Sequence, residues 1–244
     1  MSAPPLEPTE IVPWPGRGRR FERRMRPGIA DVVGDGRSGR ARLDAIARWL
    51  QDVAYEDLVE AGFEGRGAWV VRRTRIRVDS FPAFGEQLRL ATFCSAIGRF
   101  CAERRTTIEG AGAALEAVSL WICLDPEIRR PIRFEEDFLA AYSESAAGRA
   151  AGVRLRHGEP PADTPSRPWA FRATDIDVAG HVNNSHYWSA LEEQLAAGPE
   201  PNSIDAEIEH HAPAQAGPAA LLGEGRRLWI ASPEGELQAS IAVL

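Results

Sequence analysis

One segment, residues 174–188, decides how this chain is interpreted: Thr174-Asp175-Ile176-Asp177-Val178-Ala179-Gly180-His181-Val182-Asn183-Asn184-Ser185-His186-Tyr187-Trp188. It places a carboxylate (Asp177), an imidazole (His181) and two amides (Asn183 and Asn184) on a glycine-containing turn that leads into a helix. Backbone N–H groups at the start of a helix attract developing negative charge. A carboxylate held beside such a start can activate water while the N–H groups polarise a carbonyl. The segment therefore favours acyl hydrolysis.

Composition narrows the class of protein. A chain of 244 residues forms one large domain or two small ones, and its net charge of −6 argues against nucleic acid as the main partner. It has no apolar run long enough for a membrane span, and no signal peptide is recognised at the N-terminus. Cys94, Cys101 and Cys123 suit a reducing compartment and read as small buried hydrophobes, so we expect a cytoplasmic protein. No lysine is present, which rules out a P-loop at Gly34–Gly39.

The first half of the chain is predicted to contain one helix within a series of strands. Apolar residues from Leu43 to Leu58 recur at helical spacing, which predicts an amphipathic helix that ends near Gly62. A strand is predicted from Phe21 to Val33, and a short helix at 134–144. Between the two helices, segments bounded by Gly and Pro predict strands at 67–79, 86–96, 99–109 and 113–124.

The second half has the same order. A strand at 168–174, the glycine turn and a helix at 184–197 are followed by four strand-like segments at 204–212, 218–223, 226–232 and 236–243. We therefore divide the chain into a Pro-rich tail or lid (1–20), a first repeat (21–145), a linker (146–166) and a second repeat (167–244).

The two halves look like a duplication. The turn Asp35–Gly39 enters the first helix as Asp177–His181 enters the second. A helix followed by strands with short connections favours an antiparallel sheet wrapped around one long helix, an α+β fold. Pairing two such sheets edge to edge closes a free edge. One chain would then be a pseudo-dimer with one good and one degenerate site, and a homodimer of whole chains stays open.

The motif itself points to a family. Asp-x-Asp-x-x-Gly-His-Val-Asn-Asn-x-x-Tyr, from Asp175 to Tyr187, resembles the signature of hotdog-fold thioesterases. With the segments Trp69–Arg73, Val78–Pro82 and Ser119–Asp125, the chain from about Phe21 onward resembles the acyl-acyl-carrier-protein (acyl-ACP) thioesterases. That resemblance implies two fused hotdog repeats, with the functional site in the second.

The resemblance also implies roles for the motif residues. Asp177 would be the general base or nucleophile, and His181 would orient it or polarise water. Asn183 and Asn184 are expected to cap the helix, and a backbone N–H between Val182 and Asn184 is expected to hold the oxyanion. The match differs from plant-type enzymes, which place an asparagine at the position of Ala179 and an acidic residue beside a cysteine in the segment comparable to Glu209–Ala214. The Ala-Gly pair instead resembles coenzyme A thioesterases of the hydroxybenzoyl type.

The helices carry further expectations. Tyr187, Trp188, Leu191 and Leu195 recur at helical spacing and are predicted to face the core. Glu192 and Glu193 are read as solvated surface charges. On the first helix, Gln51 and Asp52 are candidates for contacts across the interface between the repeats.

These observations predict a thiolester hydrolase that releases a free fatty or related acid from acyl-ACP, with no metal and no organic cofactor. The alternatives are an acyl-CoA thioesterase and a degenerate hotdog protein that binds acyl thioesters without hydrolysing them. The expected partners are acyl carrier protein or a coenzyme A thioester, and neither nucleic acid nor a membrane span is expected.

Overall fold

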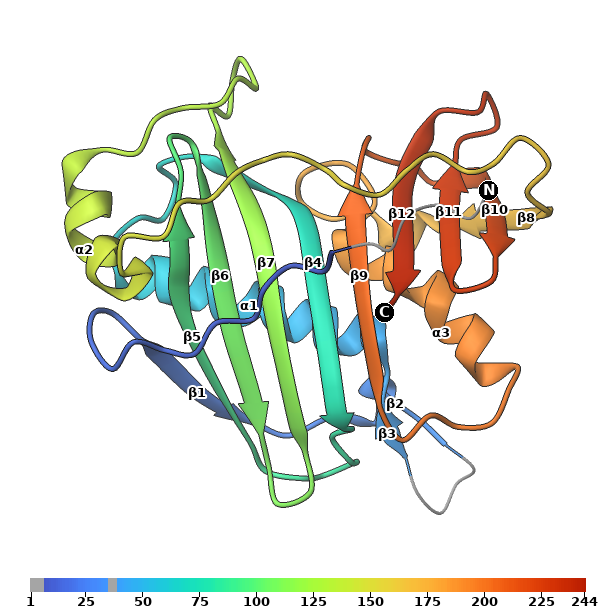
Figure 1. The fold of residues 1–244 in the computed structure, drawn as a ribbon, viewed down its shortest axis with the longest axis horizontal. Coiled ribbons are helices and arrows are strands. Elements are labelled where there is room, and N and C mark those ends of the chain that lie inside the picture. The colour runs from blue at the N-terminus through green and yellow to red at the C-terminus, as the bar shows by residue number, and fades with distance from the viewer. Residues whose placement is uncertain (1–6, 35–38) are drawn as a thin grey trace.

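The computed structural model describes residues 7–34 and 39–244, and in this part of the chain a ten-stranded sheet dominates (Figure 1). Every pair of neighbouring strands in it is antiparallel. The strands of the first half are β1 (Phe21–Met25), β4 (Ala68–Ser80), β5 (Leu88–Ile97), β6 (Cys101–Glu109) and β7 (Ala114–Leu124). Those of the second half are β8 (Ser166–Phe171), β9 (Ile204–His210), β10 (Gly217–Glu224), β11 (Arg227–Ala231) and β12 (Leu237–Val243). The α+β class and the large antiparallel sheet are as predicted.

The strand order repeats in the two halves. The first half runs β1-β5-β6-β7-β4, and the second, read from its outer edge, runs β8-β10-β11-β12-β9. In each half, therefore, the first strand pairs with the third, and the second strand lies at the opposite edge. The halves meet at these second strands, where β4 pairs with β9 from Arg73–Glu209 to Val78–Ile204.

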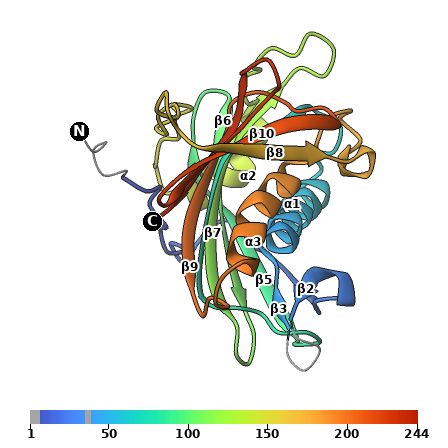
Figure 2. The same ribbon diagram turned by 90° about the vertical axis from the view of Figure 1, so that its right-hand side faces the viewer.

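The main helices cover one face of the sheet (Figure 2). In the first half this is α1 (Leu43–Glu60), between β1 and β4 in the chain. In the second it is a 3₁₀ turn, η3 (Asn184–Trp188), that continues into α3 (Ser189–Ala196), between β8 and β9. A third helix, α2 (Glu136–Ala146), packs against β5. The smaller elements are η1 (Ile29–Asp31), the β2–β3 pair (Val32–Val33 and Arg40–Ala41) and η2 (Ala173–Asp175).

The core lies between these helices and the sheet. Apolar residues that alternate along β4 and β9 point into it, and Ile76, Ala206 and Ile208 are fully buried there. Tyr187, Trp188 and Leu191 are also buried, as their helical spacing predicts.

Polar residues occupy the opposite face of the sheet, where the N-terminal segment and the linker cross it (Figure 1). Glu207 is fully buried and accepts hydrogen bonds from the backbone N–H of Thr9 (2.8 Å) and the guanidinium of Arg156 (3.2 Å). Burial raises the pKa of Glu207, but the nearby His157 imidazole (3.6 Å), hydrogen bonding from Thr9 and the charge of Arg156 outweigh it and lower the pKa to about 2. The described part of the N-terminal segment is therefore bound to the outer face of the sheet.

Nearby on that face, Glu209 accepts the backbone N–H groups of Arg156 (2.9 Å) and His157 (2.8 Å). His157, Glu207 and Glu209 form the one cluster of metal-ligand type found among the described residues. Because both carboxylates already hold backbone N–H groups, this cluster fastens the linker across the junction of the two halves.

Three local predictions were wrong. The strand expected from Phe21 to Val33 stops at Met25, since Pro27 and Gly28 interrupt it and η1 follows. The helix expected at 184–197 begins as a 3₁₀ turn and becomes α-helical at Ser189. Glu192 is buried rather than solvated.

The Glu192 carboxylate pairs with Arg40 (2.6 Å) and accepts the backbone N–H of Leu43 (3.0 Å). It therefore satisfies a free N–H at the start of α1, where the flanking Arg42 provides no side-chain cap. A residue of the second half thus completes the helix of the first half.

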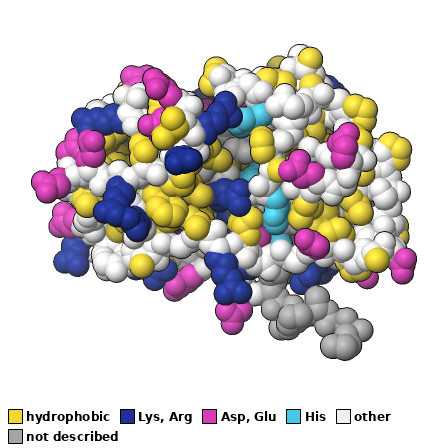
Figure 3. All heavy atoms as spheres, turned by 90° about the horizontal axis from the view of Figure 1, so that it is seen from above, with side chains coloured by type: hydrophobic (Ala, Val, Ile, Leu, Met, Phe, Trp, Pro, Cys, Tyr) yellow, Lys and Arg dark blue, Asp and Glu magenta, His cyan; other side chains and the backbone are white. Residues whose placement is uncertain are grey.

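The turn Asp35–Gly39, which we compared with Asp177–His181, lies outside the described residues except for Gly39. None of the described helices is long and apolar enough to cross a membrane. Seen from above (Figure 3), arginine side chains surround exposed hydrophobic side chains over the first half, and histidine side chains lie near the middle of the molecule.

Candidate active site

A tight turn fixes the position of Asp177. Ile176 and Val182 form an antiparallel bridge, and the N–H of Asp177 donates to the carbonyl of His181 (3.0 Å). Within this loop the N–H of Gly180 donates to the carbonyl of Asp177 (3.0 Å), and Gly180 has φ = 78°. Because a side chain is strained in that left-handed conformation, glycine suits this position.

The carboxylate of Asp177 is held by two donors. One oxygen accepts the backbone N–H of Ala179 (2.8 Å), and the other accepts the side-chain amide of Asn183 (3.0 Å). The side chain is half-buried and lines a large cavity. Position 179, where plant-type enzymes carry an asparagine, thus contributes its backbone here, while Asn183 contributes the amide.

A pair of amides links this turn to the first half. The side chain of Gln51, on α1, donates to Asn183 Oδ1 (3.2 Å), and Asn183 Nδ2 donates to Gln51 Oε1 (3.0 Å). The predicted contact of Gln51 across the halves is confirmed. Asp52 lines the same cavity, and partial burial raises its pKa, although Arg23 and Arg48 oppose the shift. Gln51 was detectable in the sequence as a polar residue within the apolar spacing of the first helix.

At the start of the second helix, one N–H group has no acceptor among the described residues. Asn183 is the N-cap residue, and its side chain accepts from the N–H of Ser185 (2.9 Å). The N–H of Val182 donates to Ala214 (2.9 Å), and that of Asn183 donates to Asp175 (2.8 Å). Val182 and Asn183 are therefore corrected as oxyanion donors, because their N–H groups are occupied. Asn184 is the remaining candidate, since its N–H has no acceptor among the described residues.

The structure does not bring His181 to Asp177. Its ring nitrogen Nδ1 lies 3.4 Å from the carbonyl of Val182, and no hydrogen bond within the described chain joins the ring to the Asp177 carboxylate. No contact therefore supports the expectation that His181 orients Asp177. The side-chain amide of Asn183 contacts the carboxylate instead. The motif contains a second histidine, His186, whose ring nitrogen Nδ1 lies 3.6 Å from Oδ1 of Asp175.

The cavity beside Asp177 has a volume of about 920 Å³. Its walls come from α1, from β4 to β7 and from the turn that carries Asp177. The residues that line it are Gln51, Asp52, Ala54, Tyr55, Leu58, Gly65, Gly67, Trp69, Cys94, Ala102, Glu103, Arg104, Trp121, Phe138, Ile176, Asp177, Val178, Ala179 and Asn183. Most of them belong to the first half. Trp69 and Trp121 lie in segments that carry the family resemblance, whereas nothing in the sequence marks Arg104 as a wall residue. A neighbouring cavity of about 340 Å³ shares Trp69 and Phe138 as a wall.

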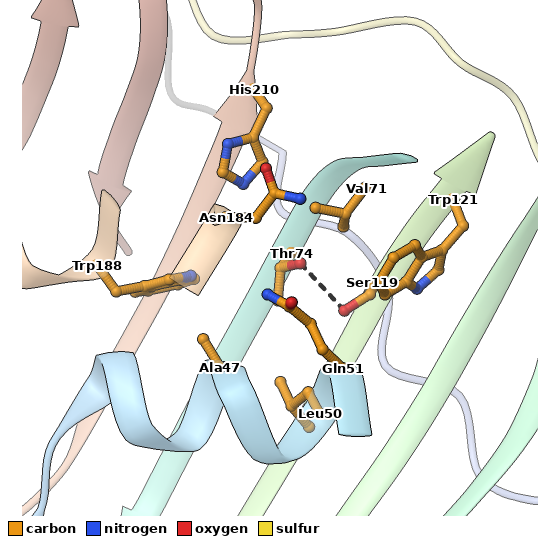
Figure 4. Close-up of a pocket in the computed structure, with 10 residues that line it drawn as sticks. All are labelled: Ala47, Leu50, Gln51, Val71, Thr74, Ser119, Trp121, Asn184, Trp188 and His210. Carbon is orange, nitrogen blue, oxygen red and sulfur yellow. Dashed lines mark hydrogen bonds between the residues drawn. The ribbon is translucent and has the colours of Figure 1, made fainter. Parts of the chain in front are cut away.

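A much smaller cavity, about 10 Å³, lies between α1, β4, β7 and the start of the second helix (Figure 4). Gln51 and Trp121 line both this cavity and the large one. Asn184 and His210 border it, and the hydroxyl groups of Thr74 and Ser119 hydrogen-bond across it at 3.0 Å. Burial, reinforced by the charges of Arg72 and His211, lowers the pKa of His210 to about 3, so its imidazole stays neutral at neutral pH.

Comparison with known protein families identifies the family of this chain. The family model for the acyl-ACP thioesterase N-terminal domain matches residues 21–142, and the model for the C-terminal domain matches residues 158–219. The chain belongs to the acyl-ACP thioesterase family.

Curated proteins from bacteria and plants are similar to the chain in sequence. An uncharacterized protein of Mycobacterium tuberculosis is 30% identical over 179 residues, which are 72% of each chain. An oleoyl-acyl carrier protein thioesterase of Arabidopsis thaliana is 23% identical over 60% of this chain and 47% of its own length.

Solved structures share the fold. The 12:0-ACP thioesterase of Umbellularia californica superposes with a TM-score of 0.72 at 17% identity, covering 93% of this chain and 97% of its own. An acyl-ACP thioesterase of Bacteroides thetaiotaomicron gives a TM-score of 0.71 at 17% identity, covering 92% and 97%.

Proposed function

We propose that this protein hydrolyses an acyl thioester carried by acyl carrier protein, releasing a free acid and the carrier thiol. The observation that carries the proposal is the half-buried carboxylate of Asp177, which lines a cavity of about 920 Å³. Membership of the acyl-ACP thioesterase family supports the reaction class and the carrier.

In this proposal the two halves are hotdog repeats with different tasks. The repeated strand order supports the duplication. The first repeat, residues 21–145, receives the acyl chain, because most of the cavity wall belongs to it. The second repeat, residues 167–244, supplies Asp177 and the leading end of its helix. The linker at 146–166 connects them across the outer face of the sheet.

The proposed reaction uses Asp177 as a general base. Its carboxylate takes a proton from water while the water oxygen attacks the thioester carbon, and the carbonyl oxygen gains a negative charge. The N–H of Asn184, which has no acceptor among the described residues, donates to this oxygen. The tetrahedral intermediate then expels the thiolate, which takes the proton from Asp177, so that an acid and a thiol leave and the carboxylate is restored.

Gln51 and Asn183 are positioning residues in this scheme. Their paired amides fix the orientation of the carboxylate. His181 is left out of the step because its ring does not contact Asp177.

Replacement of Asp177 tests the proposal. Asp177→Asn keeps the shape of the side chain and removes the base, so thiol release should fall by about 10²-fold or more. The matched control is Asp175→Asn, on the same loop, whose carboxylate accepts the N–H of Arg172 (2.7 Å). We expect the control to stay within a few-fold of the wild type, because the side-chain oxygen of an asparagine at position 175 can still accept this N–H.

The panel should present each acyl group on acyl carrier protein and on coenzyme A, with thermal unfolding of both variants as a check on folding. Turnover by Asp177→Asn equal to that of the wild type contradicts the role of Asp177. Faster turnover of coenzyme A thioesters contradicts the choice of carrier.

A further inference from the structure

The large cavity contains one cation among the described residues that line it, the guanidinium of Arg104. Arg104 lies on β6, beside apolar or weakly polar wall residues of the first half: Cys94, Ala102, Trp121 and Phe138. Asp177 belongs to the turn of the second half, so an acyl chain whose thioester lies at Asp177 extends toward this wall. A charged group placed beside apolar wall residues typically selects and orients a ligand.

Arg104 is held in place by a carboxylate behind the wall. Its Nη2 lies 2.7 Å from Oδ2 of Asp57, which belongs to α1 and is 1% exposed. Tyr142 donates to the same carboxylate (3.0 Å), and the guanidinium of Arg104 lies over its ring. The group is therefore fixed and cannot withdraw from the cavity into solvent.

Asp57 also pairs with a second arginine, Arg19. The Nε of Arg19 donates to Oδ1 of Asp57 (2.6 Å), so two guanidinium groups share one buried carboxylate. The other partner of Arg19 is Glu60, whose side chain is 62% exposed and so is screened by water. Glu103 precedes Arg104 on β6, and its carboxylate accepts from the hydroxyl of Ser95 (3.0 Å).

The donors of Arg104 are only partly used. A guanidinium carries five N–H donors. Within the described chain, those of Arg104 reach Asp57 and, at 3.5 Å, the hydroxyl of Thr92. A plain alkyl chain beside this group would displace water and offer no acceptor, which costs free energy. An oxygen atom on the acyl chain would accept the free donors.

We propose that the acyl group hydrolysed at this site carries a hydrogen-bond-accepting oxygen, as a hydroxyl or keto group, at a position remote from the thioester, and that Arg104 binds this oxygen. The inference rests on the proposed function and narrows its substrate class. A site built to bind a polar group discriminates strongly against the analogue that lacks it.

Matched substrates test the inference. Each pair consists of a saturated acyl chain and the same chain with a hydroxyl group, moved along the chain from one pair to the next, both on the same carrier. For the best-placed hydroxyl we expect kcat/KM of the wild type to exceed that of the plain chain by about tenfold or more. Equal or higher kcat/KM for every plain chain overturns the proposal.

Two variants separate substrate binding from the structural pairing with Asp57. Arg104→Met should remove the preference and raise kcat/KM for the plain chain relative to the hydroxylated one. Arg19→Met also removes a partner of Asp57, but Arg19 does not line the cavity, so this control should keep the wild-type preference. Loss of the preference in both variants to the same degree contradicts a direct contact with substrate.

Binding of the free acids provides a readout that needs no turnover. By calorimetry, the hydroxylated acid should bind the wild type more tightly than the plain acid, and Arg104→Met should cancel the difference. Absence of hydrolysis with this binding preference intact refutes the proposed function alone. Hydrolysis without any preference refutes the role of Arg104 alone.

Discussion

The two halves of the sheet have the same strand order but different helices. In the first half, α1 is regular over eighteen residues and packs against a wall that leaves room for a large cavity. In the second half the corresponding segment starts as a five-residue 3₁₀ turn and is α-helical for only eight residues. The loop that precedes it carries Asp177 on a hydrogen-bonded turn.

The two halves therefore contribute different parts of the candidate site. The first half provides most of the cavity wall, and the second provides the turn that holds Asp177. A regular amphipathic helix can cover a cavity, because its apolar face is continuous. A turn with bound N–H groups can hold a carboxylate in one orientation, because each group has a defined partner. The cross-connections Gln51–Asn183 and Glu192–Leu43 show that neither half is complete without the other.

The largest expected loss in the free energy of unfolding comes from a change on the outer face of the sheet, where the two halves join. Glu207→Ala leaves Arg156 without its buried partner and frees the N–H of Thr9, so we expect a loss of about 3–5 kcal/mol in the free energy of unfolding. Glu109→Ala is the control, since the side chains of Glu109 and its partner Arg89 are 50% and 40% exposed, and such a surface pair should contribute about 1 kcal/mol or less. Chemical denaturation measures both, and equal losses contradict the importance of this junction.

The next largest effect is expected at the contact between α1 and the turn that carries Asp177. Gln51→Ala removes a hydrogen-bond partner of Asn183 and loosens the carboxylate of Asp177, so kcat should fall by about 10- to 100-fold, with a small change in KM. Gln87→Ala, which removes an exposed hydrogen bond to the carbonyl of Met25, is the control and should leave kcat unchanged. A selective rise in KM for Gln51→Ala indicates that Gln51 binds substrate and does not position the base.

The sequence correctly predicted the helices and strands whose residues follow a local pattern. The helix from Leu43 was found because its apolar spacing reflects the face it buries, and the strands after it because Gly and Pro bound them. The 3₁₀ start of the second helix was missed because the helical pattern hides the weak helix propensity of Asn184, Ser185 and His186. Glu192 looked like a surface charge because its partner, Arg40, is far away in the chain. Arg104 looked like any other charged strand residue, since the cavity beside it depends on how α1 packs.

The halves should also differ in how they respond to pH. Around the small cavity the first half supplies the hydroxyl groups of Thr74 and Ser119, which do not titrate, whereas the second supplies His210. Its folded pKa of about 3 lies below the unfolded value of about 6.5. Between these values the unfolded chain binds a proton that the folded chain does not. Stability is therefore complete above the unfolded pKa and falls by about 1.4 kcal/mol per pH unit below it.

His210→Phe tests this assignment while keeping a ring against Tyr187. The slope of unfolding free energy between roughly pH 6 and 5 should be smaller in the variant by about one proton. His211, whose pKa burial also lowers, contributes to the slope that remains. Glu207 acts only at lower pH, since its pKa is depressed from an ordinary value of 4.5, so it does not interfere in this window. An unchanged slope contradicts the neutral state of His210.

The smallest expected effect on stability comes from replacing one glycine in each half, and this pair of variants compares the two halves directly. Gly62, after α1, and Gly180, before η3, have nearly the same left-handed φ of 79° and 78°, and a Cβ added at either would meet no atom within 4 Å. Alanine at each position should therefore cost a similar amount of stability, about 1–2 kcal/mol from backbone strain alone. Only Gly180→Ala disturbs the turn that aims Asp177, so only this variant should lose turnover beyond its loss of folded protein. Paired unfolding and kinetic measurements compare them directly. Equal turnover in two equally stable variants would mean that the turn does not orient the carboxylate.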